Sequence, residues 1–304
     1  MSKQQWADDL VKLIGGKHVK IDEPLSNHTM TRMGGQADLF CDPETEESVQ
    51  AVVRYAFEHD IPVLLLGNGS NMVVRDGGVR GIVLNLSNLN EVRFDGTSVY
   101  AESGADIKAV SRQSAKRGLT GFEFACGIPG SVGGAMVMNA GAYGGEIKDI
   151  IHRCTILTPE GERLVLSKEE LELGYRTSII AKKGYYVLSA EFVLEEGDQE
   201  EIDAKVADLT HQRESKQPLE YPSAGSVFKR PPGYFAGKLI QDSGLQGKGF
   251  GGAEVSTKHA GFIVNKNGAT ATDYIRTIEM VREAVKDNFG VDLELEVKIV
   301  GEES

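Results

Sequence analysis

Residues 126–147 read CGIPGSVGGAMVMNAGAYGGEI, a stretch in which seven glycines stand among apolar residues. Glycine loses more conformational freedom on folding than any other residue, so this density carries a free-energy cost. Glycine is used in spite of this cost where the backbone must approach another group more closely than a Cβ atom would permit. We therefore expect the backbone of this stretch to lie against a bulky partner.

A second glycine loop lies earlier in the chain. The sequence GNGSN, residues 67–71, directly follows the apolar run IPVLLL at 61–66. Successive backbone N–H groups in such a turn form a nest that binds an anion without a charged side chain. In the longer stretch, Ser131 and Asn139 offer additional side-chain hydrogen bonds. Either loop alone would be interpreted as a tight structural turn, but two of them in an α/β context favour a large phosphate-bearing cofactor.

Composition and charge exclude several classes of protein. The 304 residues suggest two domains, and 40% apolar with 26% charged residues is ordinary for a globular protein with a sizeable core. A net charge of −12 argues against a nucleic-acid partner, because phosphate affinity depends on Lys and Arg. The N-terminus has no apolar segment typical of a signal peptide, and the longest apolar runs are too short to span a membrane. We therefore expect no membrane partner.

The cysteines and histidines show no pattern that indicates a metal or a disulfide framework. Cys41, Cys126 and Cys154 are widely spaced, and the six histidines have no ligand-like spacing. This cysteine usage and the absence of a signal sequence indicate a reduced, cytoplasmic protein, and we expect no metal site.

Hydrophobic periodicity predicts a mixture of helices and strands. Helices are expected over 42–60, 105–118, 200–216 and 272–290, short apolar strands over 61–66 and 81–86, a hairpin over 152–166 closed at 159–161, and a strand within 184–197. Over 291–301 apolar and charged residues alternate, which predicts a half-buried strand with Glu296 on its polar face.

Two features of the C-terminal half have competing interpretations. The acidic run 195–201 is either a linker between domains or the solvated start of the following helix. The sequence GKGFGG at 247–252 matches the dinucleotide-binding glycine pattern, but a turn and a strand are predicted after it where that motif requires a helix. We therefore do not expect a Rossmann site there.

Several motifs, taken in order, resemble one known family. They are NHTMTRMGGQADLF, LLLGNGSNMVVRDGG, GIPGSVGGAMVMNAGAYGGEI, GYRTSII, YPSAGSVFKRP, AGKLIQDSGLQGKGFGGAEVSTKHAGFIVN and LELEVKIVG. The ordered set, which runs from about residue 22 to residue 301, resembles the UDP-N-acetylenolpyruvoylglucosamine reductases. The segment between Arg176 and Ser226 is short, as in the subclass that lacks an inserted loop closing over the substrate.

The resemblance implies an α+β fold in two parts. A vanillyl-alcohol-oxidase-type FAD-binding region, made of two α+β subdomains, would occupy 1–203. A smaller α+β substrate-binding domain would occupy 204–304, with its last residues as candidates for returning to the first subdomain. The glycines of the opening stretch would then let the backbone wrap the FAD diphosphate.

The implied activity is a two-step reduction. NADPH would deliver a hydride to non-covalently bound FAD, and the reduced flavin would pass it to the vinyl carbon of UDP-N-acetylglucosamine enolpyruvate. The product, UDP-N-acetylmuramate, is a peptidoglycan precursor. The family therefore implies roles in cell-wall biogenesis, cell shape, the cell cycle and cell division, and we expect a monomer.

Three residues match positions that the family uses in catalysis. Arg176 lies in GYRTS, Ser226 in AGSVF and Glu296 in LELEV. Taken alone, they would be interpreted as a surface arginine, a turn serine and an acid on a wet strand face. Within the family, Arg176 and a neutral Glu296 would stabilise charge that develops beside the substrate carboxylate, and Ser226 would donate a proton to carbon.

The resemblance assigns cofactor contacts to the two glycine loops, at Gly67, Asn68, Gly69, Ser70, Asn71, Gly127, Ile128, Pro129, Gly130, Ser131, Gly133, Gly134, Asn139, Gly141 and Ala142. A local excess of basic residues supports an anionic substrate independently of the family. Between 204 and 266 there are nine basic and five acidic residues, in a chain of net charge −12. The candidates for substrate contacts are Lys216, Lys229, Arg230 and Tyr175. The ordinary interpretation of these charges is a solvated mixed surface.

Two other functions compete with the reductase. One is another FAD-dependent oxidase of the same fold, which would use O₂. The other is a non-catalytic sugar-nucleotide-binding protein with a degenerate flavin site. The YRTS and AGSVF motifs favour the reductase over the oxidase, and the presence of Arg176, Ser226 and Glu296 argues against a degenerate site.

Overall fold

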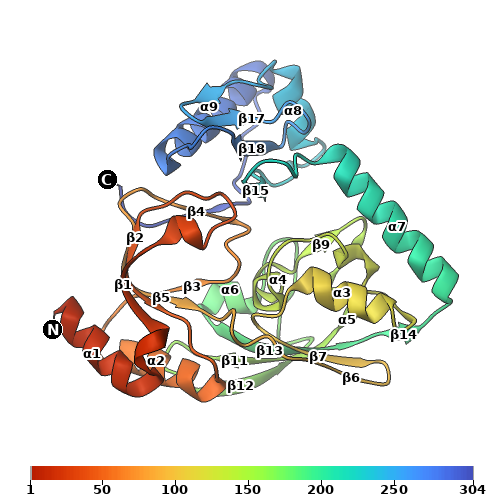
Figure 1. Cartoon of the computed structure of the whole chain (residues 1–304). Coiled ribbons are helices and arrows are strands. Elements are labelled where there is room, and N and C mark those ends of the chain that lie inside the picture. The colour runs from red at the N-terminus through yellow and green to blue at the C-terminus, as the bar shows by residue number, and fades with distance from the viewer. Residues whose placement is uncertain (1, 304) are drawn as a thin grey trace. The chain divides into compact units, whose positions relative to one another are not determined.

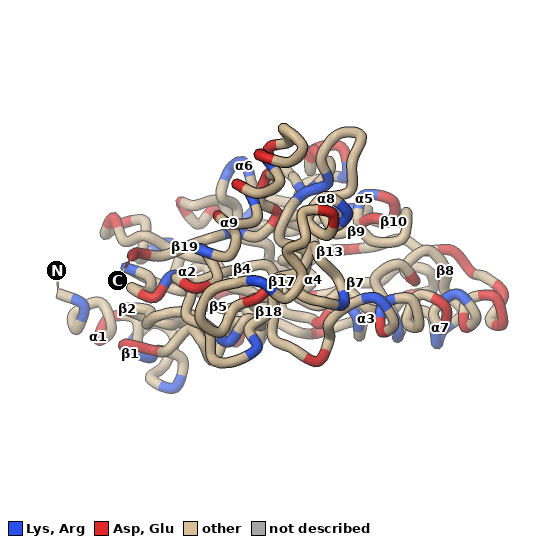
Figure 2. Tube along the Cα trace, turned by 90° about the horizontal axis from the view of Figure 1, so that it is seen from above, with Lys and Arg blue, Asp and Glu red and all other residues tan. Residues whose placement is uncertain are grey.

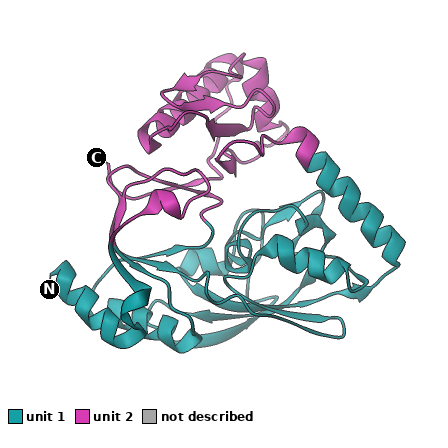
Figure 3. Cartoon of the chain, in the orientation of Figure 1, with its two compact units in different colours: residues 1–21, 39–68, 81–213 teal, residues 22–38, 69–80, 214–304 magenta. Residues whose placement is uncertain are grey.

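The structure, a computed structural model, describes residues 2–303. It divides into two compact units, each assembled from several segments of the chain (Figure 3). Unit 1 comprises residues 1–21, 39–68 and 81–213, and unit 2 comprises residues 22–38, 69–80 and 214–304. The last division falls inside helix α7 (Gln199–Lys216), ten residues beyond the domain boundary that the sequence suggested. The acidic run 195–201 contributes strand β14 (Glu195–Glu196) and the start of α7.

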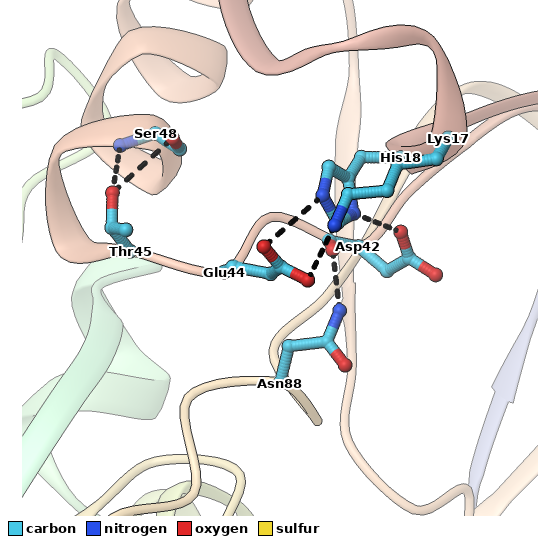
Figure 4. A network of polar contacts seen from close by, with 7 residues as sticks. All are labelled: Lys17, His18, Asp42, Glu44, Thr45, Ser48 and Asn88. Carbon is cyan, nitrogen blue, oxygen red and sulfur yellow. Dashed lines mark hydrogen bonds and ion pairs between the residues drawn. The ribbon is translucent and has the colours of Figure 1, made fainter.

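Two helices near the N-terminus share a hydrophobic core with a sheet of strand order β1-β2-β5-β3 (Figure 1). The strands are β1 (Val19–Pro24), β2 (Gln36–Cys41), β5 (Val79–Asn85) and β3 (Val63–Leu66). Helix α2 (Glu46–Glu58) confirms the helix expected over 42–60. It begins where the Thr45 hydroxyl accepts a hydrogen bond from the Ser48 N–H at 3.2 Å (Figure 4). Helix α1 (Lys3–Ile14), which the sequence analysis did not anticipate, buries Ala7 and Leu10 in the same core.

The larger part of unit 1 is a five-stranded antiparallel sheet with the order β12-β11-β13-β7-β6. Its strands are β12 (Arg163–Ser167), β11 (Ile151–Leu157), β13 (Tyr186–Val193), β7 (Ser98–Glu102) and β6 (Val92–Asp95). The predicted hairpin over 152–166 is confirmed, because β11 and β12 pair and the Gly161 N–H donates to the Thr158 carbonyl. Helices α3 (Ile107–Ala115) and α4 (Val132–Met138) share a hydrophobic core with this sheet.

Unit 2 has its own sheet and core. The sheet has the order β15-β18-β17-β16, and helices α8 and α9 share its hydrophobic core. The elements are β15 (Ser223–Ser226), β18 (Phe262–Asn265), β17 (Ala253–Val255), β16 (Gly249–Phe250), α8 (Ala236–Asp242) and α9 (Ala271–Phe289). The sequence GKGFGG at 247–252 forms the β16–β17 hairpin, which confirms that no helix follows it.

The expected strand over 291–301 is mostly wrong as an element. Only β19 (Lys298–Val300) is a strand, and it pairs in parallel with β4 (Met72–Val74). The predicted alternation of burial holds over 291–294, but Leu295 and Glu296 are both half-buried. A single bridge joins Leu295 to Phe228 before the chain moves on to β4, so residues 291–297 have no continuous neighbouring strand.

The remaining short elements are η1 (Gly16–His18), η2 (Leu25–Asn27), β8 (Leu119–Thr120), η3 (Glu123–Ala125), β9 (Gly141–Ala142), β10 (Gly145–Glu146), α5 (Ile147–Ile150) and α6 (Ile179–Lys183). Charged residues of both signs line α7, which buries only Ile202 and Leu209 (Figure 2). Within residues 2–303, every helix is too short or too polar to cross a bilayer.

Candidate active site

The glycine-rich stretch is partly a helix. The sequence predicts a loop over 127–144, but residues 132–138 form α4, and the Ser131 hydroxyl caps this helix by accepting from the Gly134 N–H at 3.3 Å. The two glycine loops meet here, because a Cβ at Gly67 would lie 2.7 Å from Ser131 Oγ. A Cβ at Gly133 would overlap the Ser103 hydroxyl of unit 1. Part of the glycine density therefore lets the chain pack against itself.

Gly134 differs from Gly133 in what surrounds it. It is exposed, and the nearest atom that a Cβ would meet is Ser131 Oγ at 3.5 Å, an ordinary van der Waals contact. Packing within the protein therefore does not require a glycine at this position. Close approach by a ligand remains a reason for its presence, as the sequence analysis expected.

Arg213, near the end of α7, lies over the same stretch and was missed by the sequence analysis. A Cβ at Gly127 would lie 2.6 Å from Arg213 Cδ and 3.5 Å from Nε. Burial lowers the pKa of the Arg213 guanidinium, although Tyr143 and Cys126 oppose the shift. Among residues 2–303 it forms no ion pair or hydrogen bond, so a half-buried cation faces the loop without an anionic partner. Such a cation fits a ligand phosphate.

Asn139 connects the glycine-rich stretch to Arg176. Its buried side chain donates to the Glu146 carboxylate at 2.6 Å and to the Gly174 carbonyl at 3.1 Å, and accepts from the Lys148 N–H at 2.9 Å. Both amide protons and the oxygen are thereby used within unit 1. The geometry gives Asn139 a positioning role, while the cofactor contact expected of it stays a prediction.

Arg176 lies in a tight turn with a strained backbone. Gly174 and Thr177 exchange both of their backbone hydrogen bonds, and Arg176, third of the four turn residues, has φ of +55°. A left-handed conformation costs a residue other than glycine about 1–2 kcal/mol. Its guanidinium donates to the Gly141 carbonyl at 3.4 Å and lies over the ring of Tyr175, which is 57% exposed. Arg176 therefore lies beside the end of the glycine-rich stretch.

Ser226 is presented by a bulge in unit 2. Between Ser223 and Ser226 the register of β15 against β18 shifts, and Gly225 takes φ of +75° at that point. Bulges of this kind redirect a side chain, and glycine accepts the left-handed conformation that they need. Ser226 is exposed, and its hydroxyl has no hydrogen-bond partner among the described residues.

Glu296 lies next to Ser226 although seventy positions separate them in sequence. The Glu296 N–H donates to the carbonyl of Val227 at 2.8 Å, and the Lys229 N–H donates to the Glu294 carbonyl at 2.9 Å. The structure thus brings together two of the three predicted catalytic residues in unit 2. Arg176, the third, belongs to unit 1.

The substrate candidates on unit 2 already have contacts. Lys229 forms an ion pair with Glu294 at 3.3 Å, and the Arg230 guanidinium lies over the ring of Phe235, which is 63% exposed. Lys216 is the exposed last residue of α7. The other predicted cofactor residues lie in the loops as expected: Asn68, Gly69, Ser70, Asn71, Ile128, Pro129, Gly130 and Ala142. Cys41, Cys126 and Cys154 are buried free thiols.

A match to an FAD-binding family identifies the chain as a flavoprotein. Residues 37–167 match the family model described as an FAD binding domain, and residues 217–300 match that of the UDP-N-acetylenolpyruvoylglucosamine reductase C-terminal domain. The chain is 65% identical over 300 residues to the enzyme of this name from Geobacillus kaustophilus, covering 99% of both chains. It is 60% identical over 304 residues to that of Exiguobacterium sibiricum, covering 100% of both.

A solved structure agrees with these relatives. The crystal structure of UDP-N-acetylenolpyruvylglucosamine reductase from Thermus caldophilus superposes with a TM-score of 0.79 at 32% identity, covering 93% of this chain and 98% of that one. The chain belongs to the UDP-N-acetylenolpyruvoylglucosamine reductase family. The predicted family, the α+β fold with an FAD-binding region followed by a smaller domain, the reductase activity and the FAD cofactor are confirmed.

Proposed function

We propose that this chain reduces the enolpyruvyl group of UDP-N-acetylglucosamine enolpyruvate to UDP-N-acetylmuramate with electrons from NADPH, and that Arg176, Ser226 and Glu296 are its catalytic residues. The observation that carries the assignment is the backbone pairing of Glu296 with Val227, next to the exposed hydroxyl of Ser226. Addition across an activated double bond requires a proton donor, for which the Ser226 hydroxyl is our candidate, and the Glu296 carboxyl group is our candidate for stabilising the charge.

The residues around the glycine stretch fit an FAD diphosphate. Gly134 leaves an open face, and Arg213 supplies a cation without an anionic partner among residues 2–303. These two residues, with the backbone of 127–131, are our candidates for holding the cofactor. When bound, FAD would supply the redox chemistry that links NADPH to the vinyl carbon of the substrate.

The protein residues stabilise the negative charge that this transfer creates and supply the proton that it requires. Negative charge develops on the carbon next to the substrate carboxylate, and the Arg176 guanidinium stabilises it electrostatically. The strained backbone at Arg176 supports a functional role, because strain of this kind clusters at sites where geometry matters more than stability. Ser226 Oγ–H donates its proton to that carbon, and Glu296 stabilises the developing charge by a hydrogen bond. The net change is one hydride and one proton added across the double bond.

The substrate diphosphate is assigned to basic side chains near Ser226. Lys229 and Arg230 lie three and four positions after Ser226 in sequence, and Lys216 ends the helix that precedes it. Lys229 is paired with Glu294 in an exposed ion pair, which is weak enough to exchange for a phosphate. Tyr175, exposed beside Arg176, is the candidate for a stacking contact.

Several finer assignments complete the proposal. We infer a cytoplasmic monomer that acts in cell-wall synthesis, with consequences for cell shape, the cell cycle and cell division. We also infer that FAD binding is the task of residues 1–203 and substrate binding that of 204–304, with the C-terminal strand β19 paired to β4 within the first of these ranges.

The decisive experiment separates the reductase from an oxidase. The purified flavoprotein is reduced anaerobically with NADPH and then mixed either with UDP-N-acetylglucosamine enolpyruvate or with air-saturated buffer. We expect reoxidation by the enolpyruvyl substrate within milliseconds to seconds, with stoichiometric UDP-N-acetylmuramate. Rapid reoxidation by O₂ with none by the substrate would instead indicate an oxidase of the same fold.

A further inference from the structure

Asn71, the last residue of the first glycine loop, contacts Glu296 in unit 2. Its side-chain amide donates to the Glu296 carbonyl oxygen at 3.0 Å. In return, the Asn71 carbonyl accepts from the Lys298 N–H at 3.0 Å. Asn71 therefore contacts the chain on both sides of Val297, at the point where β4 begins to pair with β19.

The contact gives Glu296 backbone hydrogen bonds in two directions. Its N–H donates to the Val227 carbonyl at 2.8 Å, and its carbonyl accepts from Asn71. The first bond ties Glu296 to the strand that carries Ser226, and the second ties it to the glycine loop. Residues 291–297 are outside any strand, so these bonds replace a regular ladder in fixing the main chain at Glu296.

The second bond comes from the side chain of Asn71 and not from the pairing of β4 with β19. Regular pairing of β4 with β19 covers Met72–Val74 against Lys298–Val300 and stops short of Glu296. The Asn71 amide reaches one step beyond this ladder. A residue without a side-chain N–H donor at position 71 would leave a half-buried carbonyl without this partner.

We propose that Asn71 is a positioning residue that fixes the main chain of Glu296, and so orients its carboxyl group relative to Ser226. This inference rests on the proposed roles of Glu296 and Ser226 and revises the role of Asn71 itself, for which the sequence indicated a contact with FAD. A displacement of about 1 Å at a catalytic group can slow a reaction by about a hundredfold, so loss of one orienting bond has a measurable effect.

The test compares Asn71→Ala and Asn71→Asp in the FAD-loaded enzyme by anaerobic stopped-flow absorbance. Asp keeps the shape of the side chain but places an acceptor against the Glu296 carbonyl. We expect both variants to keep their FAD and to be reduced by NADPH within twofold of the wild-type rate. Reoxidation by the enolpyruvyl substrate should slow about 10- to 100-fold. Asn88→Ala is the matched control, because its amide also donates to a backbone carbonyl, that of Asp42, in a surface network of unit 1 (Figure 4).

A double-mutant comparison tests whether Asn71 affects reoxidation through Glu296. If Asn71 acts through Glu296, adding Asn71→Ala to Glu296→Gln should slow reoxidation by less than a further twofold. Hydrogen exchange should also become faster in Asn71→Ala at the amides of 296–298 and remain unchanged in Asn88→Ala.

Three results would overturn the proposal: loss of FAD from the Asn71 variants, equal slowing of both half-reactions, or effects of Asn71→Ala and Glu296→Gln that multiply in full. Failure of the proposed function would look different, because wild-type reduced enzyme would then not be reoxidised by the substrate at all. In that case unchanged exchange at 296–298 in Asn71→Ala would still refute the positioning role.

Discussion

Gly133 and Gly134 are adjacent, and the structure predicts that alanine at each will act by a different mechanism. A Cβ at Gly133 would overlap the Ser103 hydroxyl and lie 3.2 Å from Ser103 Cβ, so the neighbouring backbone must shift. Overpacking of this kind costs roughly 1–3 kcal/mol. At Gly134 a Cβ meets only Ser131 Oγ at 3.5 Å, and the position is exposed. Alanine there gains up to about 1 kcal/mol from helix propensity.

For FAD binding, we expect Gly134→Ala to be the damaging substitution, although it does not lower the stability of the apoprotein. If the diphosphate lies against the backbone at Gly134, a methyl group there displaces it from its charged hydrogen bonds, each worth about 1.5–3 kcal/mol. The dissociation constant for FAD should then rise by roughly 10- to 150-fold, since 1.4 kcal/mol corresponds to a factor of ten. We therefore expect Gly134→Ala to leave the apoprotein as stable as wild type or slightly more stable, but to bind FAD weakly.

The assay titrates apoprotein with FAD by flavin fluorescence and measures the free energy of unfolding of the apoprotein in urea. Gly133→Ala serves as the comparison, with lowered apoprotein stability as its main effect. The reasoning about the loop is refuted if Gly134→Ala binds FAD within twofold of wild type, because a backbone in contact with the diphosphate could not tolerate the added carbon.

Two further predictions concern residues that the structure revealed. Arg213→Met keeps the aliphatic stem over Gly127 but removes the charge, so FAD affinity should fall at least tenfold without loss of apoprotein stability; unchanged affinity would exclude a cofactor role for Arg213. Asp76 accepts the Ala271 and Thr272 N–H groups and the Thr272 hydroxyl at the start of α9, so Asp76→Asn should lower the free energy of unfolding by about 1–3 kcal/mol at pH 7. Burial alone would raise the pKa of Asp76, but these hydrogen bonds outweigh burial and lower the pKa below its unfolded value. The stabilisation that the Asp76 carboxylate gives to the fold is therefore complete above about pH 5 and is lost as the pH falls toward the folded-state pKa. A difference in urea stability between wild type and Asp76→Asn that grows between pH 5 and pH 3 would contradict this assignment.

Local signals in the sequence were sufficient where neighbouring residues decide the structure. Thr45 caps α2 because its hydroxyl reaches an N–H three positions along, and Gly290 ends α9 in the left-handed conformation. The residues that follow GKGFGG were likewise sufficient to predict that no helix, and so no dinucleotide-binding motif, begins there. The order of the family motifs was sufficient to identify the family.

Non-local contacts explain what the sequence could not predict. Residues 291–297 alternate like a strand, but the neighbours that they meet, Val227 and Asn71, come from two distant segments and support no continuous ladder. The position of Arg213 over Gly127 depends on where α7 packs, and 85 residues separate the two in sequence. Several glycines of the opening stretch are explained by close packing within the protein. In a sequence, a glycine needed for such packing cannot be distinguished from one needed for contact with a ligand.

The separate half-reactions of Ser226→Ala test the proposed catalytic site most directly. Ser226 lies in the exposed bulge of β15, and its change to alanine removes only a hydroxyl that has no partner among residues 2–303. Reduction of the flavin by NADPH involves no protonation of carbon and should proceed at the wild-type rate. Reoxidation by the enolpyruvyl substrate should slow by roughly 10²–10⁴, the usual effect of losing a positioned acid, and Ser226→Cys should recover part of the rate. Equal slowing of the two half-reactions, measured at the flavin absorbance band, would contradict the assignment of Ser226 as the proton donor and leave Glu296 or water as the source.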